Sequence, residues 1–476
     1  MTWTPAIAWA RAPDGSLRPE CLFLATALLS GLVLSVLNPP MQGPDEGAHL
    51  RRAYQLSEGQ VLAHGANGDL GGELPVSLRT GALREWGRIC LHPERRVTRQ
   101  AIDDLLAEPL APSTIEFMDF RNTAVYSPVP YLPQALILAP ARLAEARPVL
   151  LLYLARFAGF AAWSGLVFFA IRATPAGKWS MAMVALSPVA MVQGTVLNAD
   201  SVTNGLGFVT LALGLRVALG PRGRHVGWRE VCVFTLASAL LAVCKFVYAP
   251  LVLLILALER ERTASAKQHA AMLGFAIGVT AIAWLGWSIA AARLRLPPVP
   301  LQPVLGGQSP TALHSGRAAV LLSAFRHPLD FVAMVARTAI HDRVWVRGMS
   351  WVDWNVVLPG AFTWAGFVLL IAVAIVDTDP EHPVSARLRV LAATAALLSL
   401  LGAYLIHFMM WTVPGDRYIG GVHGRYAIPV APAMLLALGA GRAAKARRFL
   451  PLAMVGFGLL SMGVTSWALL ERYYFP

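Results

Sequence analysis

The sequence predicts an all-α, polytopic membrane protein. Of its 476 residues, 56% are hydrophobic and only 14% are charged, and the mean hydropathy is +0.56. The apolar residues gather in many runs of roughly 17 to 25 residues, long enough for a helix to cross a bilayer. Helices are expected because the bilayer core offers no hydrogen-bond partner to an unpaired backbone group. The whole chain, residues 1–476, is therefore expected to form one integral membrane domain.

The net charge of +13 does not indicate a nucleic-acid partner. The lysines and arginines lie in short loops between the apolar runs, where they report membrane topology. The four cysteines form neither a disulfide framework nor a metal-binding spacing. The first apolar run, residues 21–37, precedes Asn38-Pro39-Pro40 without a small-residue cleavage site, so it predicts a retained first transmembrane helix.

The apolar runs leave two long polar segments between them. After the first helix, the expected order is a long extracytoplasmic loop with the catalytic residues (38–148), transmembrane helices 2 to 7 (149–292), a second extracytoplasmic loop (293–360) and transmembrane helices 8 to 11 (361–470). Neither loop is expected to be disordered. The first has helix-compatible stretches at 46–58 and 99–106, and the second has an amphipathic stretch at 324–340.

One apolar run, Val231 to Leu258, is long enough for one steep helix or for two short ones, and Lys245 interrupts it midway. A hairpin here places all the basic loops on one side of the membrane, whereas a single crossing puts the basic loop at 442–448 outside, against the positive-inside tendency. The hairpin is therefore preferred. It predicts about eleven transmembrane helices, with the N-terminus in the cytoplasm and the C-terminus outside.

With this topology, polar residues from several span ends converge on the outer face. They are Asp45 and Glu46 after the first span, Asn198 and Asp200 between the third and fourth, Lys245 between the fifth and sixth, and His423, Arg425 and Tyr426 before the tenth. Such a site suits a substrate whose lipid tail stays in the bilayer while its polar head reaches water.

The adjacent carboxylates Asp45 and Glu46 are the catalytic candidates, since they would serve as a general base or hold a divalent cation. The alternative is that Asp45 only caps a helix after Pro44. In a helix over 44–58, Asp45, His49 and Arg52 share one face. That face is either a cation or phosphate site, or an exposed surface.

Lys245 is costly within a 28-residue apolar stretch unless it reaches the interface or an anion, so it either snorkels or contacts a lipid phosphate. The late segment with His423, Arg425 and Tyr426 combines flexible glycines with an arginine that can grip phosphate, although an ordinary loop has the same residue types. Tyr126, in a stretch rich in aromatic residues and prolines, either lines a sugar pocket or anchors the loop at the membrane interface.

These motifs resemble a family of bacterial membrane proteins of formerly unknown function that is grouped with the GT-C glycosyltransferases. The resemblance covers nearly the whole chain. It is carried by Pro-Asp-Glu with a following His and Arg-Ala-Tyr-Gln, by Tyr-Ser-Pro with Tyr-Leu-Pro-Gln, by Asn-x-Asp, and by Gly-x-x-Gly-Arg-Tyr-x-x-Pro. Two positions depart from the usual pattern: Gly47 stands where Pro often follows the acidic pair, and His423 stands where Gln is common.

The resemblance implies a GT-C-like bundle that uses a sugar attached to a polyprenyl phosphate. By position, Asp45 looks like the catalytic acid of the first loop, with Glu46 as a candidate to share its role. Asp200 looks similar to a second acidic site, and Lys245 and Arg425 look like phosphate contacts.

The function expected is transfer of a sugar to a cell-envelope glycan or lipid-linked acceptor at the outer face of the bacterial inner membrane. Membrane lipids are expected partners and nucleic acid is not. A divalent cation, Mg²⁺ or Mn²⁺, stays open, with Asp45, His49 and Asp200 as candidate ligands. The alternatives are a lipid-linked polysaccharide polymerase or ligase, and a non-enzymatic transporter or flippase, which would be expected to show internal repeats.

Overall fold

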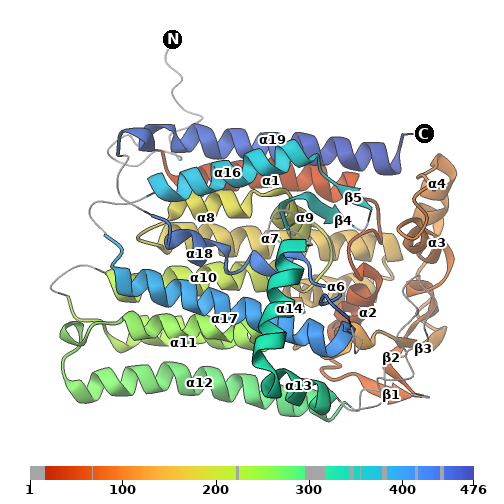
Figure 1. The fold of residues 1–476 in the computed structure, drawn as a ribbon. Coiled ribbons are helices and arrows are strands. Elements are labelled where there is room, and N and C mark those ends of the chain that lie inside the picture. Colours follow the sequence, from red (N-terminus) through yellow and green to blue (C-terminus); the bar gives the residue numbers. More distant parts are fainter. Residues whose placement is uncertain are drawn as a thin grey trace.

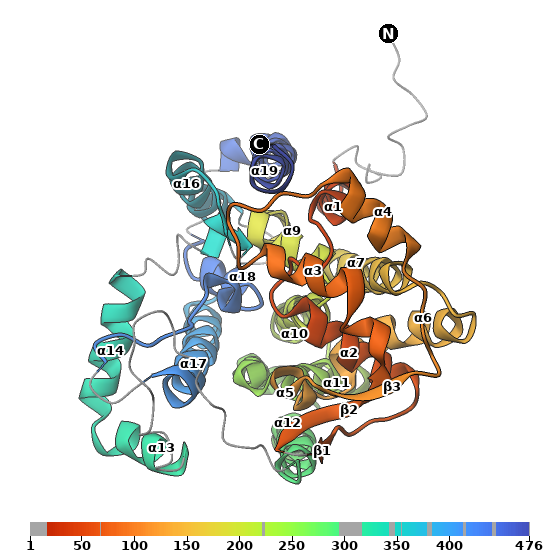
Figure 2. The same ribbon diagram turned by 90° about the vertical axis from the view of Figure 1, so that its right-hand side faces the viewer.

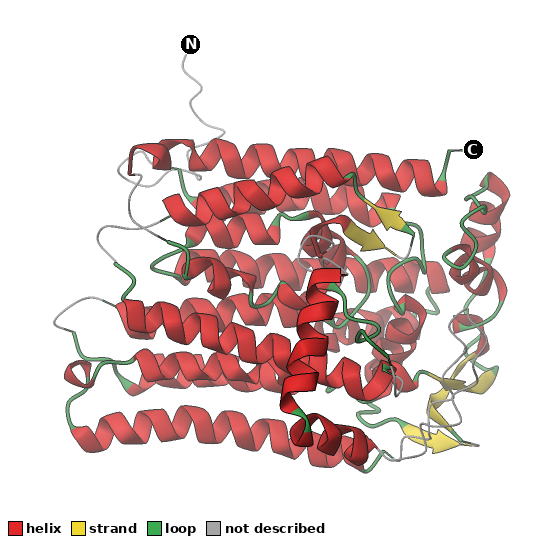
Figure 3. Cartoon of the chain, viewed as in Figure 1, coloured by secondary structure: helices red, strands yellow, loops and turns green. Residues whose placement is uncertain are grey.

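Long helices lie side by side through most of the molecule, and the few strands gather toward one end (Figure 1 and Figure 3). The computed structural model describes residues 17–66, 68–220, 224–294, 317–341, 348–353, 355–377, 383–412, 416–439 and 444–475.

Among these residues, six helices are long and apolar enough to cross a membrane. They are α1 (Pro19–Leu37), α7 (Pro148–Ala173), α10 (Asp200–Leu219), α12 (Ala266–Ala292), α17 (Ala386–Trp411) and α19 (Leu450–Tyr473). Shorter apolar elements lie between them, namely α11 (Trp228–Cys244), α16 (Gly360–Val376) and the 3₁₀ helix η4 (Phe246–Ala257). The chain is therefore a multi-pass membrane protein. The total of eleven crossings stays a prediction.

The apolar run Val231–Leu258 folds back on itself. Lys245 lies between α11 and η4, at the same end of the molecule as the start of α10, because its ammonium is bonded to Asp200. At the other end, the Val226 N–H donates to the Arg262 carbonyl at 2.8 Å. The two ends of the run thus meet, as the charge pattern predicts for a hairpin. The returning arm η4 contains Pro250, which lacks the N–H that an α-helix needs.

Two other apolar runs are broken, although the sequence suggested one helix for each. The third run forms α8 (Lys178–Ala185) and α9 (Pro188–Thr195), because Pro188 cannot continue the hydrogen-bond ladder of α8. In the run at 427–440, expected as the tenth span, the α-helix among the described residues is α18 (Ala431–Leu436), which is too short to cross a bilayer alone. There are three further short 3₁₀ helices: η5 (Arg260–Arg262) follows η4, η6 (Gly424–Ala427) precedes α18, and η7 (Ala444–Phe449) precedes α19.

Residues 38–147, named the cap segment here, fold over one end of the bundle (Figure 2). Its helices are α2 (Glu46–Ser57), α3 (Gly81–Ile89), α4 (Arg99–Ala107), α5 (Arg121–Ala124) and α6 (Leu132–Leu143), with 3₁₀ turns η2 (Val76–Leu78) and η3 (Val129–Tyr131). The expected helices near 46–58 and 99–106 are confirmed as α2 and α4. The antiparallel sheet β1 (His64–Ala66), β2 (Asp69–Pro75) and β3 (Ile115–Asp119) was not expected. Gly71 permits it, since a Cβ there would lie 1.8 Å from the Met118 carbonyl oxygen.

The second long segment contains α13 (Arg317–Arg326), α14 (Pro328–His341) and the small hairpin β4 (Trp351–Asp353) and β5 (Val356–Val357). Helix α14 runs across the direction of the long helices (Figure 1). It exposes Leu329, Val332 and Ile340. An apolar face on a helix in this orientation suits the membrane surface, as expected for the amphipathic stretch 324–340.

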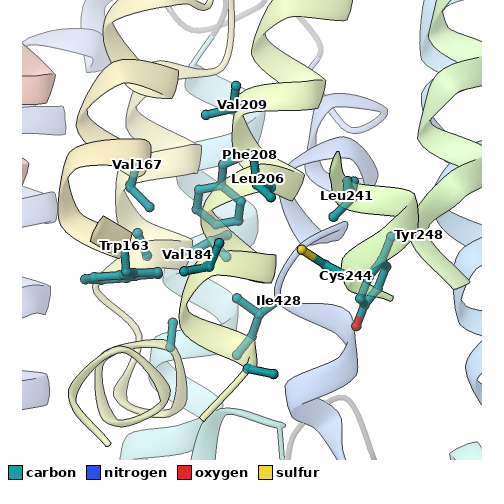
Figure 4. Close-up of a cluster of buried hydrophobic side chains, with 14 of the residues drawn as sticks. Trp163, Val167, Val184, Leu206, Phe208, Val209, Leu241, Cys244, Tyr248 and Ile428 are labelled. Carbon is teal, nitrogen blue, oxygen red and sulfur yellow. The ribbon is translucent and has the colours of Figure 1, made fainter. Parts of the chain in front are cut away.

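The core lies around α10, which is buried along almost its whole length. Figure 4 shows side chains of α7, α8, α10, α11 and η4 packed together there, among them Trp163, Phe208 and Tyr248, with Ile428 from the late segment. A Cβ at Gly207 of α10 would lie 2.9 Å from the Pro429 carbonyl oxygen. This close approach holds the late segment against α10, beside the end where Asp200 lies.

Candidate functional site

A cavity of about 520 Å³ lies between the cap segment and the ends of the long helices. It collects residues from α2, the loop after α5, the start of α10, the α11–η4 turn, α12, α17 and η6. Among its lining residues are Asp45, His49, Asn122, Tyr126, Asn198, Asp200, Lys245, Trp284, Trp287, His407, Met410, Arg425 and Tyr426. Most of the predicted outer-face residues are therefore brought together.

Asp45 lines this cavity with a strained backbone. Its φ of 57° and ψ of 20° are left-handed, a conformation uncommon for a residue other than glycine and typical of functional sites when it occurs. Asp45 occupies the N-cap position of α2, where its carbonyl accepts the Ala48 and His49 N–H groups, but its side chain makes no capping hydrogen bond. Burial raises the pKa of the Asp45 carboxyl, while Arg425 and a hydrogen bond with Asn122 act to lower it. A carboxyl with a raised pKa is a stronger base than an ordinary one.

Glu46 has a different environment, which corrects the shared catalytic role considered for it. Its side chain is fully buried against Arg156 of α7, with N–O distances of 2.6 and 2.7 Å, and it accepts the Leu197 N–H at 2.9 Å. Arg156 also donates to the carbonyl oxygens of Ser35, Asn38 and Pro39. The pair therefore ties α1, α2, α7 and the turn before α10 together.

Two cations share one carboxylate in the cavity. The Lys245 ammonium is bonded to Asp200, and the Arg425 Nε lies 3.9 Å from the other oxygen of Asp200. Lys245 also lies over the rings of Tyr126 and Tyr426, 5.7 and 5.3 Å from their centroids. Cation–π contacts and the carboxylate thus stabilise an ammonium away from water. The snorkelling interpretation of Lys245 is wrong, since it points into the protein.

His49 is buried, so the exposed-surface interpretation of its helix face is wrong. Its Nδ1 lies 2.6 Å from the Tyr131 hydroxyl, and its ring is stacked near Tyr126. Burial lowers the pKa of His49 to about 3, so the imidazole is neutral at physiological pH.

Arg52 and Asn198, both predicted to contact the substrate, make hydrogen bonds to other parts of the protein. Arg52 does not line the cavity, because its guanidinium donates to the Gln55 side chain at 2.6 Å and to the carbonyl oxygens of Val61 and Tyr126 at 2.8 and 3.0 Å. Asn198 lines the cavity, but its side chain accepts the Ser201 N–H at 2.9 Å and holds the turn before α10. Both residues position other groups of the site.

The late segment contributes Arg425 and Tyr426 to the cavity, but His423 lies behind them. The His423 ring is 4.7 Å from the Trp351 ring and 6.5 Å from Tyr426, and it does not line the cavity. Burial lowers the pKa of His423 to about 4. His423 therefore packs against other aromatic rings and does not line the cavity, contrary to its predicted role as a substrate contact.

Asn122, Trp284, Trp287 and His407 line the cavity, although the sequence interpretation did not select them. A single histidine inside an apolar span was a usable signal for His407, whose ring lies 4.8 Å from Tyr426. The tryptophans carried no such signal, because aromatic residues near span ends usually face lipid headgroups. Trp287 instead donates to the Val125 carbonyl at 3.0 Å and fixes the loop that holds Tyr126.

The candidate metal ligands Asp45, His49 and Asp200 do not fit a divalent cation well. Among the residues that the structure describes, no three His, Cys, Asp or Glu side chains form a group able to hold a metal ion. Asp200 is already neutralised by two cationic side chains. The site's electrostatics therefore come from lysine and arginine.

Residues 28–434 match the model of the family described as "Predicted membrane protein (DUF2142)". The chain belongs to this family. The matched range contains every residue that lines the cavity. No curated protein and no solved structure matches the chain. Membership in DUF2142 thus agrees with the multi-pass fold, and the activity has to be argued from the site.

Proposed function

We propose that this protein is a GT-C-type glycosyltransferase of the bacterial inner membrane, which moves a sugar from a polyprenyl-phosphate donor to a cell-envelope acceptor at the outer face. One observation carries the proposal. The cavity holds the carboxylate of Asp45, whose backbone is left-handed, together with the cations Lys245 and Arg425, and it has an apolar, aromatic wall. These are the groups that transfer from a lipid phosphate requires: a base, a leaving-group site and a place for lipid.

The cations of the cavity suit a sugar phosphodiester. Such a donor carries one negative charge, and Lys245 and Arg425 lie together beside Asp200, where both can contact its phosphate. Arg425 is suited to phosphate because its planar guanidinium donates two parallel hydrogen bonds. Preorganised cations of this kind stabilise the charge that develops on a leaving phosphate.

The wall of the cavity formed by α12 and α17 suits a prenyl chain. It presents Trp284, Ala291, Ile406 and Met410. Helix α12 has few buried side chains, so most of its surface is available to lipid. A donor would therefore keep its hydrocarbon tail in the bilayer while its phosphate reaches Lys245.

The reaction would be a single inverting displacement. Asp45 removes the proton of an acceptor hydroxyl, whose oxygen forms the new bond to the anomeric carbon. The bond between that carbon and the phosphate oxygen breaks, and the phosphate leaves with the electron pair. As the phosphate gains a negative charge, Asp45 loses one by protonation, so the total charge in the cavity is unchanged.

The test is turnover by the purified protein with a panel of polyprenyl-phosphate sugars, with and without chelator. Wild-type protein should release polyprenyl phosphate and transfer sugar, and chelator should have no effect. Asp45→Asn should lower turnover by about 10²-fold or more, because loss of a general base has that effect. Asparagine tolerates the left-handed backbone, so the melting temperature should not change.

Asp103→Asn is the matched control, since Asp103 is exposed on α4, and its turnover should equal that of the wild type. An active, folded Asp45→Asn protein would exclude Asp45 as the base. Movement of intact donor across vesicles without sugar transfer would instead support a transporter or flippase.

A further inference from the structure

A second cavity, of about 720 Å³, lies on the other side of the start of α2. It shares Asp45 and Asn122 with the first cavity, so the two meet at the proposed base. Its remaining walls come from the cap segment: α2, the segment from η2 to α3, and the β3–α5 connection. The transfer reaction described above uses none of these walls.

Arginine dominates the charge of this second cavity. Its lining contains Arg51, Arg79, Arg84 and Arg121. Two of them are paired, Arg79 with Glu116 at 2.6 Å and Arg121 with Asp119 at 2.9 Å and with Asp69. Glu46 also borders the cavity, but its carboxylate is taken by Arg156.

Arg51 and Arg84 make no ion pair with any residue that the structure describes. The Nε of Arg51 is buried without a hydrogen-bond partner. Burial and the neighbouring Arg79 lower the pKa of Arg51 to about 10, which still leaves it charged at physiological pH. A buried, charged donor without an acceptor is unfavourable unless a ligand supplies one.

The guanidinium of Arg51 lies near the first turn of α2. Its Nη1 is 3.9 Å from where a Cβ on Gly47 would stand, two residues after Asp45. That distance is an ordinary van der Waals contact, and Arg51, Gly47 and Asp45 all line this cavity. The positive dipole end of that turn also favours an anion there, although the Glu46 and Ala48 N–H groups already donate to the Gly43 and Asp45 carbonyls.

We propose that this arginine-lined cavity binds the acceptor by an anionic group, a phosphate or a carboxylate, and presents the acceptor hydroxyl to Asp45 from the side opposite the donor. The inference rests on the proposed glycosyltransferase function for the role of the ligand, but the binding itself is testable without turnover. A lipid-linked acceptor would supply a diphosphate, and an acidic glycan would supply carboxylates.

The experiment measures binding of two probes to the full-length protein in detergent by calorimetry: inorganic pyrophosphate and a galacturonate oligomer. At least one should bind the wild type. Arg51→Gln and Arg84→Gln should each weaken that binding about tenfold or more, because each removes a charge-assisted contact. Arg88→Gln is the control, since Arg88 is exposed on α3 and paired with Glu85, and it should bind as the wild type does. Melting temperatures confirm folding, and Arg84 is exposed, so its variant should fold.

The probes separate the two sources of the anion. Binding of pyrophosphate alone supports a diphosphate acceptor, and binding of the oligomer alone supports an acidic glycan. No binding by the wild type, or binding that is equal in the wild type and both variants, overturns the inference. Binding that depends on Arg51 and Arg84 in a protein that turns over no donor would leave the anion site standing and reject the glycosyltransferase. In an active protein, the same variants should raise the acceptor KM and leave the donor KM unchanged.

Discussion

Asp45 and Glu46 are adjacent, yet their carboxylates face different surroundings. Glu46 is the first residue of α2, whereas Asp45 precedes the helix with a left-handed backbone, and only Asp45 of the two lines the 520 Å³ cavity. The Glu46 side chain pairs with Arg156 of α7, while Asp45 lines the cavity that also contains Lys245 and Arg425. One carboxylate is thus neutralised and buried, and the other stays free to accept a proton.

Glu46→Gln should destabilise the protein and leave the chemistry of each folded molecule intact. The substitution leaves Arg156 as a buried charge without a counter-ion, which costs about 3–5 kcal/mol. The measurement is the melting temperature in detergent, together with turnover normalised to folded protein. Glu46→Gln combined with Arg156→Gln should recover part of the loss. An unchanged melting temperature would contradict the structural role.

The buried neutral His49 makes stability depend on pH. Its pKa is lowered from 6.5 in the unfolded chain to about 3 in the folded protein. Below pH 6.5 the unfolded chain therefore binds a proton that the folded protein does not, and stability falls as the pH decreases from 6.5 toward 3. The loss should reach about 2 kcal/mol near pH 5.

Melting temperatures of wild type and His49→Gln at about pH 7 and pH 5 check this expectation. The decrease on acidification should be smaller in His49→Gln. His64→Gln, at an exposed position on β1, should behave as the wild type does. An equal decrease in all three proteins would show that other groups cause the pH dependence.

At the residue scale, the sequence predicted which residues gather at the site better than what each one does. The motifs selected Asp45, Asp200, Lys245 and Arg425, because a charged side chain near a span end is costly in lipid and therefore faces water or a polar cavity. They did not separate Arg52 and His423 from the residues that line the cavity, or show that the Asn198 side chain holds a turn, because residue type does not determine the direction of a side chain. Those three roles depend on partners far apart in the sequence.

At the scale of elements, hydrophobicity predicted where segments are buried but not where helices break. Pro188 divides one apolar run, and Pro429 and Pro432 shorten another. Apolar content is the same on both sides of such a break, so only the prolines signalled it. The three-stranded sheet was missed because β2 contains two glycines and lacks a clear alternation of apolar and polar residues.

The apolar wall on α12 makes a prediction about the donor's chain. Ala291→Trp should obstruct the cavity beside α17 and raise the KM for long-chain donors about tenfold, since overpacking costs about 1–3 kcal/mol. A donor with a short, water-soluble chain should be affected much less. Ile282→Trp, on an exposed part of the same helix, is the control. Equal KM changes for long and short donors would place the chain elsewhere.

At the scale of the whole molecule, the basic residues of the short loops lie at the end of the helices opposite the cavity, as the predicted hairpin requires. The hairpin at Lys245 and the start of α10 both lie at the cavity end, while Arg216 and Arg262 lie at the opposite end, where Arg262 donates to the Val217 and Ala218 carbonyls. The end of α19 also returns to the cap segment, because the Val97 N–H donates to the Tyr473 carbonyl at 2.7 Å. The positive-inside tendency predicts that the basic end is the cytoplasmic side.

This orientation can be measured with single cysteines in a background where exposed Cys232 and half-buried Cys90 are serine. Leu91→Cys in the cap segment and Phe246→Cys after Lys245 should react with an impermeant thiol reagent added outside intact cells, since both side chains are exposed at the cavity end. Glu261→Cys should react only after the membrane is opened, because it lies beside Arg262 at the basic end. Labelling of Leu91→Cys and Glu261→Cys from the same side would contradict the hairpin. Labelling of Glu261→Cys alone from outside would keep the fold, place the cavity in the cytoplasm, and exclude a donor presented on the outer leaflet.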